Sequence, residues 1–240
     1  MRLTGRPRSD RPRWYGRRRG HKLRQGRQNL LDTLLPRLSL LPPADGQLDL
    51  HSLFPKPPED IWLEVGFGGG EHLAAQARAY PGVGFIGCEP FVNGVAALLA
   101  RIEDEGISNI RIFDDDARLL FDHLPDACFE RVFILFSDPW PKKRHHRRRF
   151  ICPDTLSDLA RLMKDGAELR FASDDEDYVA WTLEHFTHHS CFAWTARRPD
   201  DWRRRPRNGF ATHYETKALD RGAACIYLCF TRRSRANSPD

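Results

Sequence analysis

The chain has 240 residues, of which 40% are hydrophobic and 30% are charged, and it carries a formal net charge of +5. This length and composition predict a globular protein with one good core. No apolar run approaches the roughly 18 residues that span a bilayer, and the N-terminal region lacks the apolar segment of a signal peptide. We therefore expect a cytoplasmic protein that does not bind membranes.

Positive charge is concentrated at the N-terminus. Residues 1–28 contain ten Arg, one Lys and one Asp, so the remainder of the chain has a net negative charge. This distribution is typical of a protein that binds a polyanion. We predict that residues 1–28 form a basic tail that is disordered unless bound, although a merely solvated tail is an alternative. Residues 29–60 are expected to be a lead-in segment with an amphipathic run and a Pro-rich connector.

From residue 61 onward, short apolar strands alternate with helices. Helices are expected at 72–80, 91–106, around 119–124, 150–166 and 176–189, two of them ending at Gly106 and Gly166. Strands are expected at 61–65, 83–89, 109–113, 130–136 and 167–173, with strand-like runs at 191–196 and 224–232. Strands that are apolar on both faces predict a parallel sheet covered by helices on both sides. We expect a single domain over 61–232 and a C-terminal tail over 233–240.

Six cysteines form no Cys-x-x-Cys pair. Cys225 and Cys229 lie four residues apart in a strand-like run, without the His pair that would complete a zinc site. Reduced, mostly buried thiols and no bound metal are therefore expected.

A glycine loop follows the first strand, with the pattern Glu64-x-Gly66-x-Gly68-x-Gly70. This pattern departs from the G-x-G-x-x-G fingerprint of dinucleotide-binding proteins, which disfavours a dinucleotide oxidoreductase. Glycines allow a ligand to approach the backbone closely. The carboxylates at both ends of the loop favour a ligand with an amine or hydroxyls over a pyrophosphate. A tight turn without a ligand is the alternative.

Acidic residues follow each of the next three strands. Glu89 follows the second strand, Asp114 to Asp116 the third and Asp138 the fourth. Ligands of such sheets bind beyond the carboxyl ends of the strands, where a carboxylate can accept both ribose hydroxyls. Each acid alone could be a surface residue or a helix cap. Together they predict a pocket for a nucleoside with a positive centre and no phosphate, and S-adenosylmethionine fits that description.

The segment after the fourth strand reads FSDPWPKKRHHRRRF, residues 136–150. Asp138 is followed by two prolines that flank Trp140 and restrict the backbone, and then by eight consecutive Lys, Arg or His residues. Cations at the rim of a nucleoside pocket predict a clamp for phosphates next to the reacting base. A basic run that only aids solubility or localisation is the alternative.

The DPWPKKRHHRRRF segment, with EVGFGGG and Glu89 upstream, resembles the bacterial tRNA (guanine-N7-)-methyltransferase family over roughly residues 60–232. The segments FASDDEDY (171–178) and THYE (212–215) support the resemblance, although His213 and Tyr214 stand where Lys and Phe are common. The family implies an α/β, Rossmann-like class I methyltransferase fold with a seven-stranded, mostly parallel sheet. It further implies methyl transfer from S-adenosylmethionine to N7 of the guanine at position 46, in the variable loop of tRNA.

The resemblance also assigns roles to residues. It implies Asp138 as the catalytic residue. The donor contacts that it implies are Glu64, Gly66, Gly68, Glu89, Asp116 and Asp138. The implied substrate contacts are Lys142, Asp174, Thr212, His213, Tyr214 and Glu215. The implied RNA contacts are Arg144, His145, His146, Arg147, Arg148 and Arg149. The sequence leaves open whether the protein is a monomer or a homodimer.

The expected chemistry needs no strong base, because guanine N7 carries an in-plane lone pair. We expect Asp138 and Asp174 to orient the base and to stabilise its new positive charge. N7 lies on an edge that an A-form RNA helix hides, so the target should lie in a loop, or be splayed out, and be recognised through shape and phosphates. Residues 1–28, 142–149 and 203–207 are expected to form that RNA-binding surface.

Three other functions remain as rivals. An amino-group methyltransferase would resemble [D/N]-P-P-[Y/F/W], and the order D-P-W-P disfavours it. A non-catalytic RNA-binding module would have no need of the acids beyond the strands. A small-molecule methyltransferase would have no need of the basic run.

Overall fold

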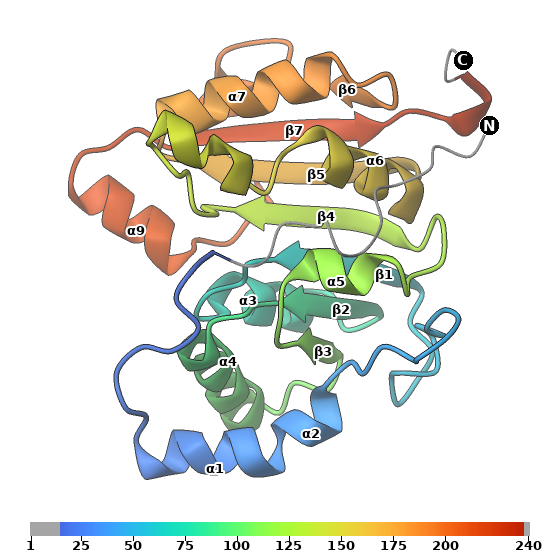
Figure 1. Cartoon of the computed structure of the whole chain (residues 1–240), viewed down its shortest axis with the longest axis vertical. Coiled ribbons are helices and arrows are strands. Elements are labelled where there is room, and N and C mark those ends of the chain that lie inside the picture. The colour runs from blue at the N-terminus through green and yellow to red at the C-terminus, as the bar shows by residue number, and fades with distance from the viewer. Residues whose placement is uncertain (1–14, 238–240) are drawn as a thin grey trace.

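The computed structural model describes residues 15–237, and its centre is a seven-stranded sheet in the order β3-β2-β1-β4-β5-β7-β6. All neighbouring strands run parallel except where β7 pairs with β5 and β6. The strands are β1 (Asp60–Val65), β2 (Val83–Cys88), β3 (Ile110–Phe113), β4 (Phe129–Leu135), β5 (Met163–Ser173), β6 (Phe192–Trp194) and β7 (Ile226–Arg232). Figure 1 shows β7 running against its neighbours. This confirms the predicted seven-stranded, mostly parallel Rossmann-like fold.

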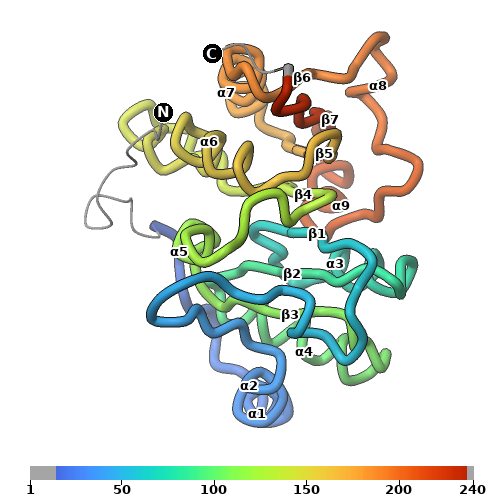
Figure 2. Tube along the Cα trace, turned by 90° about the vertical axis from the view of Figure 1, so that its right-hand side faces the viewer, coloured from blue at the N-terminus to red at the C-terminus, as the bar shows by residue number. Residues whose placement is uncertain are grey.

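Helices cover both faces of the sheet. They are α1 (Gln25–Thr33), α2 (Leu35–Leu38), α3 (Glu71–Ala79), α4 (Val92–Glu105), α5 (Ala117–Phe121), α6 (Pro153–Leu162), α7 (Glu176–Thr187), α8 (Asp200–Arg203) and α9 (His213–Asp220), with 3-10 helices η2 (Lys143–Arg148) and η3 (Arg235–Asn237). In Figure 2, α5 and α6 lie on one side of the sheet and α3 and α4 on the other. Two apolar cores result, one on each face.

The lead-in segment packs onto the domain. Leucines of α1 and α2 pack on the core beneath α4, and the Leu40 amide donates to the Ile112 carbonyl at 2.8 Å. Helix α1 begins at Gln25, so order extends into the segment that the sequence predicts to be a disordered tail. Residues 1–14 of that predicted tail lie outside the described residues.

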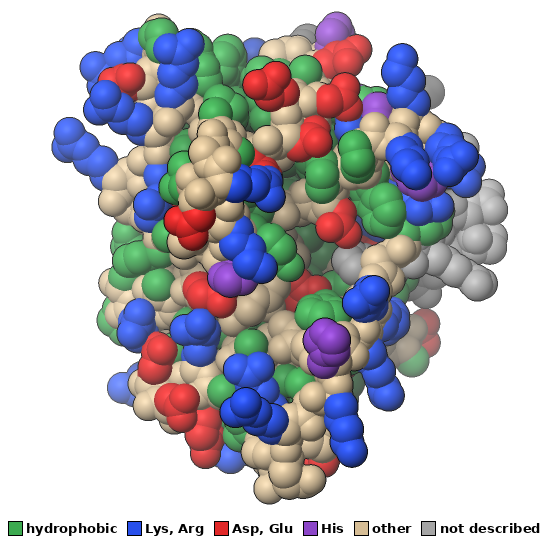
Figure 3. Space-filling view, turned by 90° about the vertical axis from the view of Figure 1, so that its left-hand side faces the viewer, with side chains coloured by type: hydrophobic (Ala, Val, Ile, Leu, Met, Phe, Trp, Pro, Cys, Tyr) green, Lys and Arg blue, Asp and Glu red, His purple; other side chains and the backbone are tan. Residues whose placement is uncertain are grey.

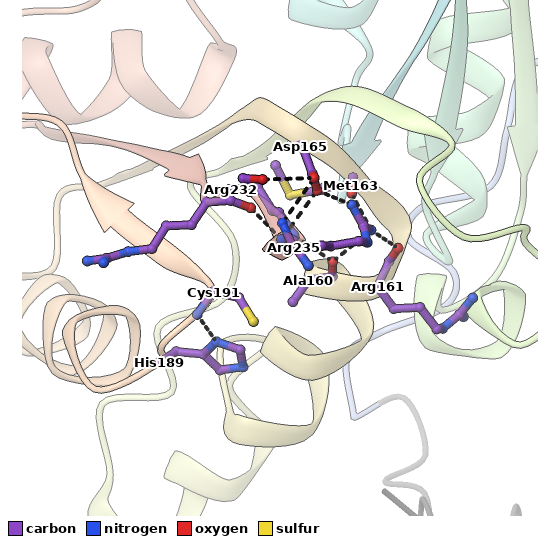
Figure 4. A network of polar contacts seen from close by, with 10 residues as sticks. Ala160, Arg161, Met163, Asp165, His189, Cys191, Arg232 and Arg235 are labelled. Atoms are coloured by element: carbon purple, nitrogen blue, oxygen red, sulfur yellow. Dashed lines mark hydrogen bonds and ion pairs between the residues drawn. The ribbon is translucent and has the colours of Figure 1, made fainter. Parts of the chain in front are cut away.

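One helix boundary differs from the prediction. Helix α4 ends at Gly106 as expected, with φ at +64°, but α6 ends at Leu162 and the chain enters β5 at Met163, three residues before Gly166. The guanidinium of Arg235 donates to the carbonyls of Arg161 and Met163, both at 2.9 Å, where α6 ends (Figure 4). A distant arginine thus satisfies the carbonyls that a longer helix would have used.

The order of the sheet creates a crevice. From β1 the chain moves outward to β2 and β3, and then returns to place β4 on the other side of β1. At such a switch point the loops beyond the carboxyl ends of the strands diverge and leave room for a ligand. Across residues 15–237, the structure contains no helix long and apolar enough to cross a membrane.

Candidate functional site

A cavity of about 380 Å³ opens at the carboxyl ends of β1, β2 and β4. Figure 3 shows the end of the molecule toward which the arrow of β4 points in Figure 1. A hollow lies near the middle of this face, with acidic side chains at the hollow and basic side chains around it. The lining residues include Val65, Gly66, Gly68, Cys88, Glu89, Phe91, Asp116, Arg118, Phe136, Asp138, Trp140, Arg148 and Tyr214. The structure therefore brings together acids that are distant in the sequence.

The glycine loop supports the cavity floor. Gly66 and Gly68 have φ angles of +73° and +55°, which disfavour residues with a Cβ atom. A Cβ at Gly68 would lie 3.2 Å from the ring of Tyr214, so the loop and that ring are in close contact. The Gly68 amide donates to Glu89 Oε2 at 2.7 Å. The loop therefore shapes the cavity and also holds one of its carboxylates.

Glu89 is fixed by the backbone. Its second carboxylate oxygen accepts a hydrogen bond from the Phe91 amide at 2.9 Å, and the residue is 6% exposed. Burial raises the pKa of Glu89, the two backbone hydrogen bonds oppose that rise, and the nearby charges of Asp138 and Glu64 add to it. The carboxylate is thus rigid, and a cation in the cavity would relieve the cost of its charge.

Asp138 stands at the cavity mouth on a strained loop. The loop follows β4, and Phe136 and Trp140 on either side of Asp138 have φ angles of +52° and +47°. Such angles are rare for aromatic residues and cluster at functional sites. Asp138 is exposed at the surface of the cavity mouth and forms no ion pair with the rest of the described chain, and partial desolvation of its carboxylate by the surrounding protein raises its pKa. An unpaired carboxylate at this point is available to a ligand.

Glu64 and Asp116 are placed differently from the prediction. Glu64 is not among the cavity-lining residues; it is 3% exposed, and its Oε2 lies 2.7 Å from Nδ1 of His72. Asp116 does line the cavity, but its carboxylate is paired with the Arg118 guanidinium and caps α5 by accepting from the Arg118 amide. In this structure a buried histidine therefore occupies the carboxylate of Glu64, for which the sequence predicts a donor contact.

The basic run separates into exposed and inward-facing residues. Lys142, Lys143, Arg144 and Arg147 are exposed. Arg148 lines the cavity, and its guanidinium lies 4.8 Å from the ring centre of Tyr15 and 4.9 Å from that of Trp140.

Two histidines and the last arginine of the run pack inward. The ring of His145 packs against Trp140, and His146 contacts Asp177 at 3.5 Å. Arg149, for which the sequence predicts an RNA contact, is only 1% exposed in this structure, and its guanidinium donates to Asp177 and to the Pro139 carbonyl.

Comparison with known proteins agrees with this geometry. The family model described as "Putative methyltransferase" matches residues 58–228. The tRNA (guanine-N(7)-)-methyltransferase of Rhodospirillum rubrum is 54% identical over 230 residues, which cover 95% of this chain and 90% of that protein. The protein of that name from Nitrobacter hamburgensis is 47% identical over 223 residues, which cover 93% and 88%. The chain belongs to the tRNA (guanine-N(7)-)-methyltransferase family.

A solved structure supports the fold of this tRNA (guanine-N(7)-)-methyltransferase family member. An rRNA methylase from Streptococcus thermophilus superimposes with a TM-score of 0.50 at 14% identity, over 73% of this chain and 88% of that chain. At this identity the likeness extends to the fold alone. In the described part of the chain, no cluster of three or more His, Cys, Asp or Glu residues could hold a metal ion. Its six cysteines are free, but only Cys88 and Cys225 are buried, fewer than predicted.

The THYE segment, residues 212–215, forms the start of α9. Thr212 and Glu215 make a reciprocal capping box, and Glu215, 2% exposed, also contacts the Tyr227 hydroxyl and Arg205. The carboxylate of Glu215, for which the sequence predicts a substrate contact, is buried among these partners and is not part of the cavity lining. Tyr214 lines the cavity, whereas His213 is exposed and outside the lining.

Asp174 and Lys142 also lie outside the lining of the cavity. The carboxylate of Asp174 follows β5 and is paired with Arg221 at the end of α9. The structure therefore does not bring Asp174 to the cavity beside Asp138. Lys142 is exposed, at the start of η2.

Sequence reasoning missed one wall of the cavity. Tyr15, Gly16 and Arg17 line it, because the segment 15–21 (the strap) lies against the start of α4. The Val92 amide donates to the Arg18 carbonyl at 2.9 Å, and Asn93 exchanges hydrogen bonds with Gly20 and His21, both at 2.8 Å. An Arg-rich composition masked this part of the cavity wall. One available signal was Asn93, a polar residue in the otherwise apolar first part of α4.

Proposed function

We propose that the chain transfers a methyl group from S-adenosylmethionine to N7 of the guanine at position 46 of tRNA. The observation that carries the proposal is the junction of an acidic cavity with a basic rim: Glu89 and Asp138 line a cavity whose edge continues into Lys142–Arg148. The names of the 54% and 47% identical relatives support the substrate.

The residues at the switch point fit a cationic nucleoside donor. Glu89 is held by two backbone amides and still has lone pairs that can accept ribose hydroxyls. The glycines at 66 and 68 leave the backbone open to close approach. When bound, such a donor supplies a methyl group carried on a positively charged sulfur, which suits a cavity lined by carboxylates.

Asp138 orients and stabilises the base. Guanine N7 attacks with its own lone pair, so no residue has to remove a proton first. The carboxylate of Asp138 accepts hydrogen bonds from the N1–H and amino groups of guanine. Its negative charge also stabilises the cationic base that forms. Because Asp138 has no ion-pair partner among the described residues, its charge is available for this role.

The exposed cations of the rim bind the RNA backbone. Lys142, Lys143, Arg144 and Arg147 are exposed beside the cavity mouth. Phosphate contacts of this kind position an RNA without reading its sequence, and they weaken as salt rises. A guanine in the variable loop, outside an A-form helix, can present its N7 edge to the cavity.

Product analysis tests the proposal. The purified protein is incubated with unmodified tRNA and methyl-labelled S-adenosylmethionine, and the digested nucleosides are identified. Label in N7-methylguanosine, mapped to position 46 by chemical cleavage at that base, is the expected result. A transcript with adenine at position 46 is the matched control and should remain unlabelled. Label in another base, or none, would contradict the proposal.

Asp138 variants test the mechanism separately. Asp138→Ala should lower turnover by roughly 10²–10³-fold, the usual cost of removing a group that stabilises developing charge. Affinity for tRNA should change little. Asp138→Asn keeps the shape of the side chain without its charge. Its turnover should lie between that of the wild type and that of Asp138→Ala. Turnover near that of the wild type in Asp138→Ala would refute the role of this carboxylate.

A further inference from the structure

Arg149 ends the basic run but is enclosed by protein. Its side chain is 0% exposed, its Nε donates to the Pro139 carbonyl at 2.7 Å, and its Nη2 donates to Asp177. The guanidinium carbon lies 5.1 Å from the ring centres of both Tyr178 and Trp181. A planar arginine can stack and bind a carbonyl at the same time, which a lysine cannot reproduce.

The same cluster holds the other side of Asp138. The hydroxyl of Tyr178, which is fully buried, accepts from the Ser137 hydroxyl and the Ile151 amide, each at 3.4 Å. Ser137 and Pro139 are the direct neighbours of Asp138 in the chain. The backbone is thus tied to one buried cluster both before and after this carboxylate.

These ties act on a loop that would otherwise relax. The left-handed angles at Phe136 and Trp140 are unfavourable for residues with a Cβ atom and persist only where the surroundings enforce them. Burying an arginine is also costly unless its charge is paired, and here Asp177 supplies the pair. The fold therefore retains a buried cation and a strained loop at the same place.

We propose that Arg149 is a positioning residue: it fixes the backbone at Pro139 and so holds the carboxylate of Asp138 at the cavity mouth. Tyr178 and Asp177 complete the support. The inference rests on the proposed function for the role of Asp138. It separates Arg149 from Arg147, two residues earlier in the run, which is exposed and suited to RNA.

The test compares Arg149→Lys with Arg147→Met. For each variant, turnover at saturating tRNA, affinity for S-adenosylmethionine and affinity for tRNA over a range of salt are measured. Arg149→Lys should lower turnover roughly 30–100-fold, because small misplacements of a reacting group cost up to about 10²-fold. Its affinities and salt slope should stay near those of the wild type. Arg147→Met, which removes the charge, should lower the salt slope by about 0.7–0.9.

Two milder variants guard against loss of folding. Asp177→Asn changes a carboxylate that is 66% exposed, and Tyr178→Phe removes only the hydroxyl. Both variants should lower turnover by less than Arg149→Lys does, with the affinity for the donor unchanged. A general destabilisation of the fold would weaken donor binding as well. A lowered salt slope in Arg149→Lys with turnover retained would overturn the inference, since that is the behaviour of an RNA contact.

The outcomes also separate this inference from the proposed function. If Asp138→Ala turns over normally, the assigned role of Asp138 fails first. If Asp138→Ala is inactive while Arg149→Lys, Asp177→Asn and Tyr178→Phe all turn over as the wild type does, only the positioning role is refuted.

Discussion

Replacing Glu215 distinguishes a structural role from a substrate contact. The carboxylate accepts from the Thr212 amide at 3.4 Å, contacts the Tyr227 hydroxyl and pairs with Arg205 at 3.0 Å. Burial, reinforced by the neighbouring Glu215 carboxylate, raises the pKa of Tyr227, so its hydroxyl stays protonated and donates. Glu215→Ala removes the acceptor of all three groups.

The cost follows from those partners. Loss of the cap on α9 costs about 1 kcal/mol. Leaving the Tyr227 hydroxyl, 8% exposed, without an acceptor costs about 1–3 kcal/mol. The side chain of Arg205 is 38% exposed and can be solvated instead, so it adds little. The sum is about 2–4 kcal/mol, or a fall in Tm of roughly 5–15 °C for a domain of this size.

Thermal unfolding followed by circular dichroism measures this change. Thr212→Ala loses only the cap and is the matched control, with a fall of about 2–4 °C. Well below its Tm, Glu215→Ala should retain measurable turnover with weaker donor binding, because α9 carries Tyr214 into the cavity. A Glu215→Ala protein that unfolds at the wild-type Tm but has no turnover would refute this reasoning and restore the substrate contact.

Three other outcomes are expected. Asn93→Ala removes two hydrogen bonds to the strap, each worth about 1 kcal/mol, and should weaken donor affinity roughly tenfold in a calorimetric titration without changing tRNA affinity. Burial raises the pKa of Glu89 and of Asp138, so these carboxylates begin to be protonated at a higher pH than ordinary carboxylates. The affinity for the donor should therefore fall as the pH is lowered. Titrations over a pH series should show this fall, and Glu89→Gln should make the affinity depend less on pH. Deleting residues 1–14, which contain five Arg, should reduce the salt slope of tRNA binding, and an unchanged slope would exclude them from the RNA-binding surface.

The sheet and the position of the site could be predicted because they depend on local pattern. Apolar runs that alternate with helical periodicity place the strands, and parallel strands bring their carboxyl ends to one edge. Glu89 directly follows β2, and Asp138 lies shortly after the end of β4. Their presence in the same cavity therefore follows from the topology of the sheet. The end of α4 at Gly106 was predictable for the same local reason.

Contacts between distant segments could not be predicted. Arg149 looks like another surface cation until Asp177 is seen beside it, and Glu64 looks like a donor contact until His72 is seen to occupy it. The end of α6 depends on Arg235, more than seventy residues further along the chain. In each case a charged side chain is satisfied by a partner that only the folded chain supplies.

The same contacts explain how a carboxylate stays free beside so many cations. Ion pairing with a neighbouring arginine would neutralise Asp138 and hold its pKa down. Instead Arg148 is held by the rings of Tyr15 and Trp140, and Arg149 by Asp177 and the Pro139 carbonyl. The pKa of Asp138 is accordingly raised by burial, with no opposing contribution from either arginine. Both arginines are therefore occupied by other partners, which leaves the charge of Asp138 available to the base.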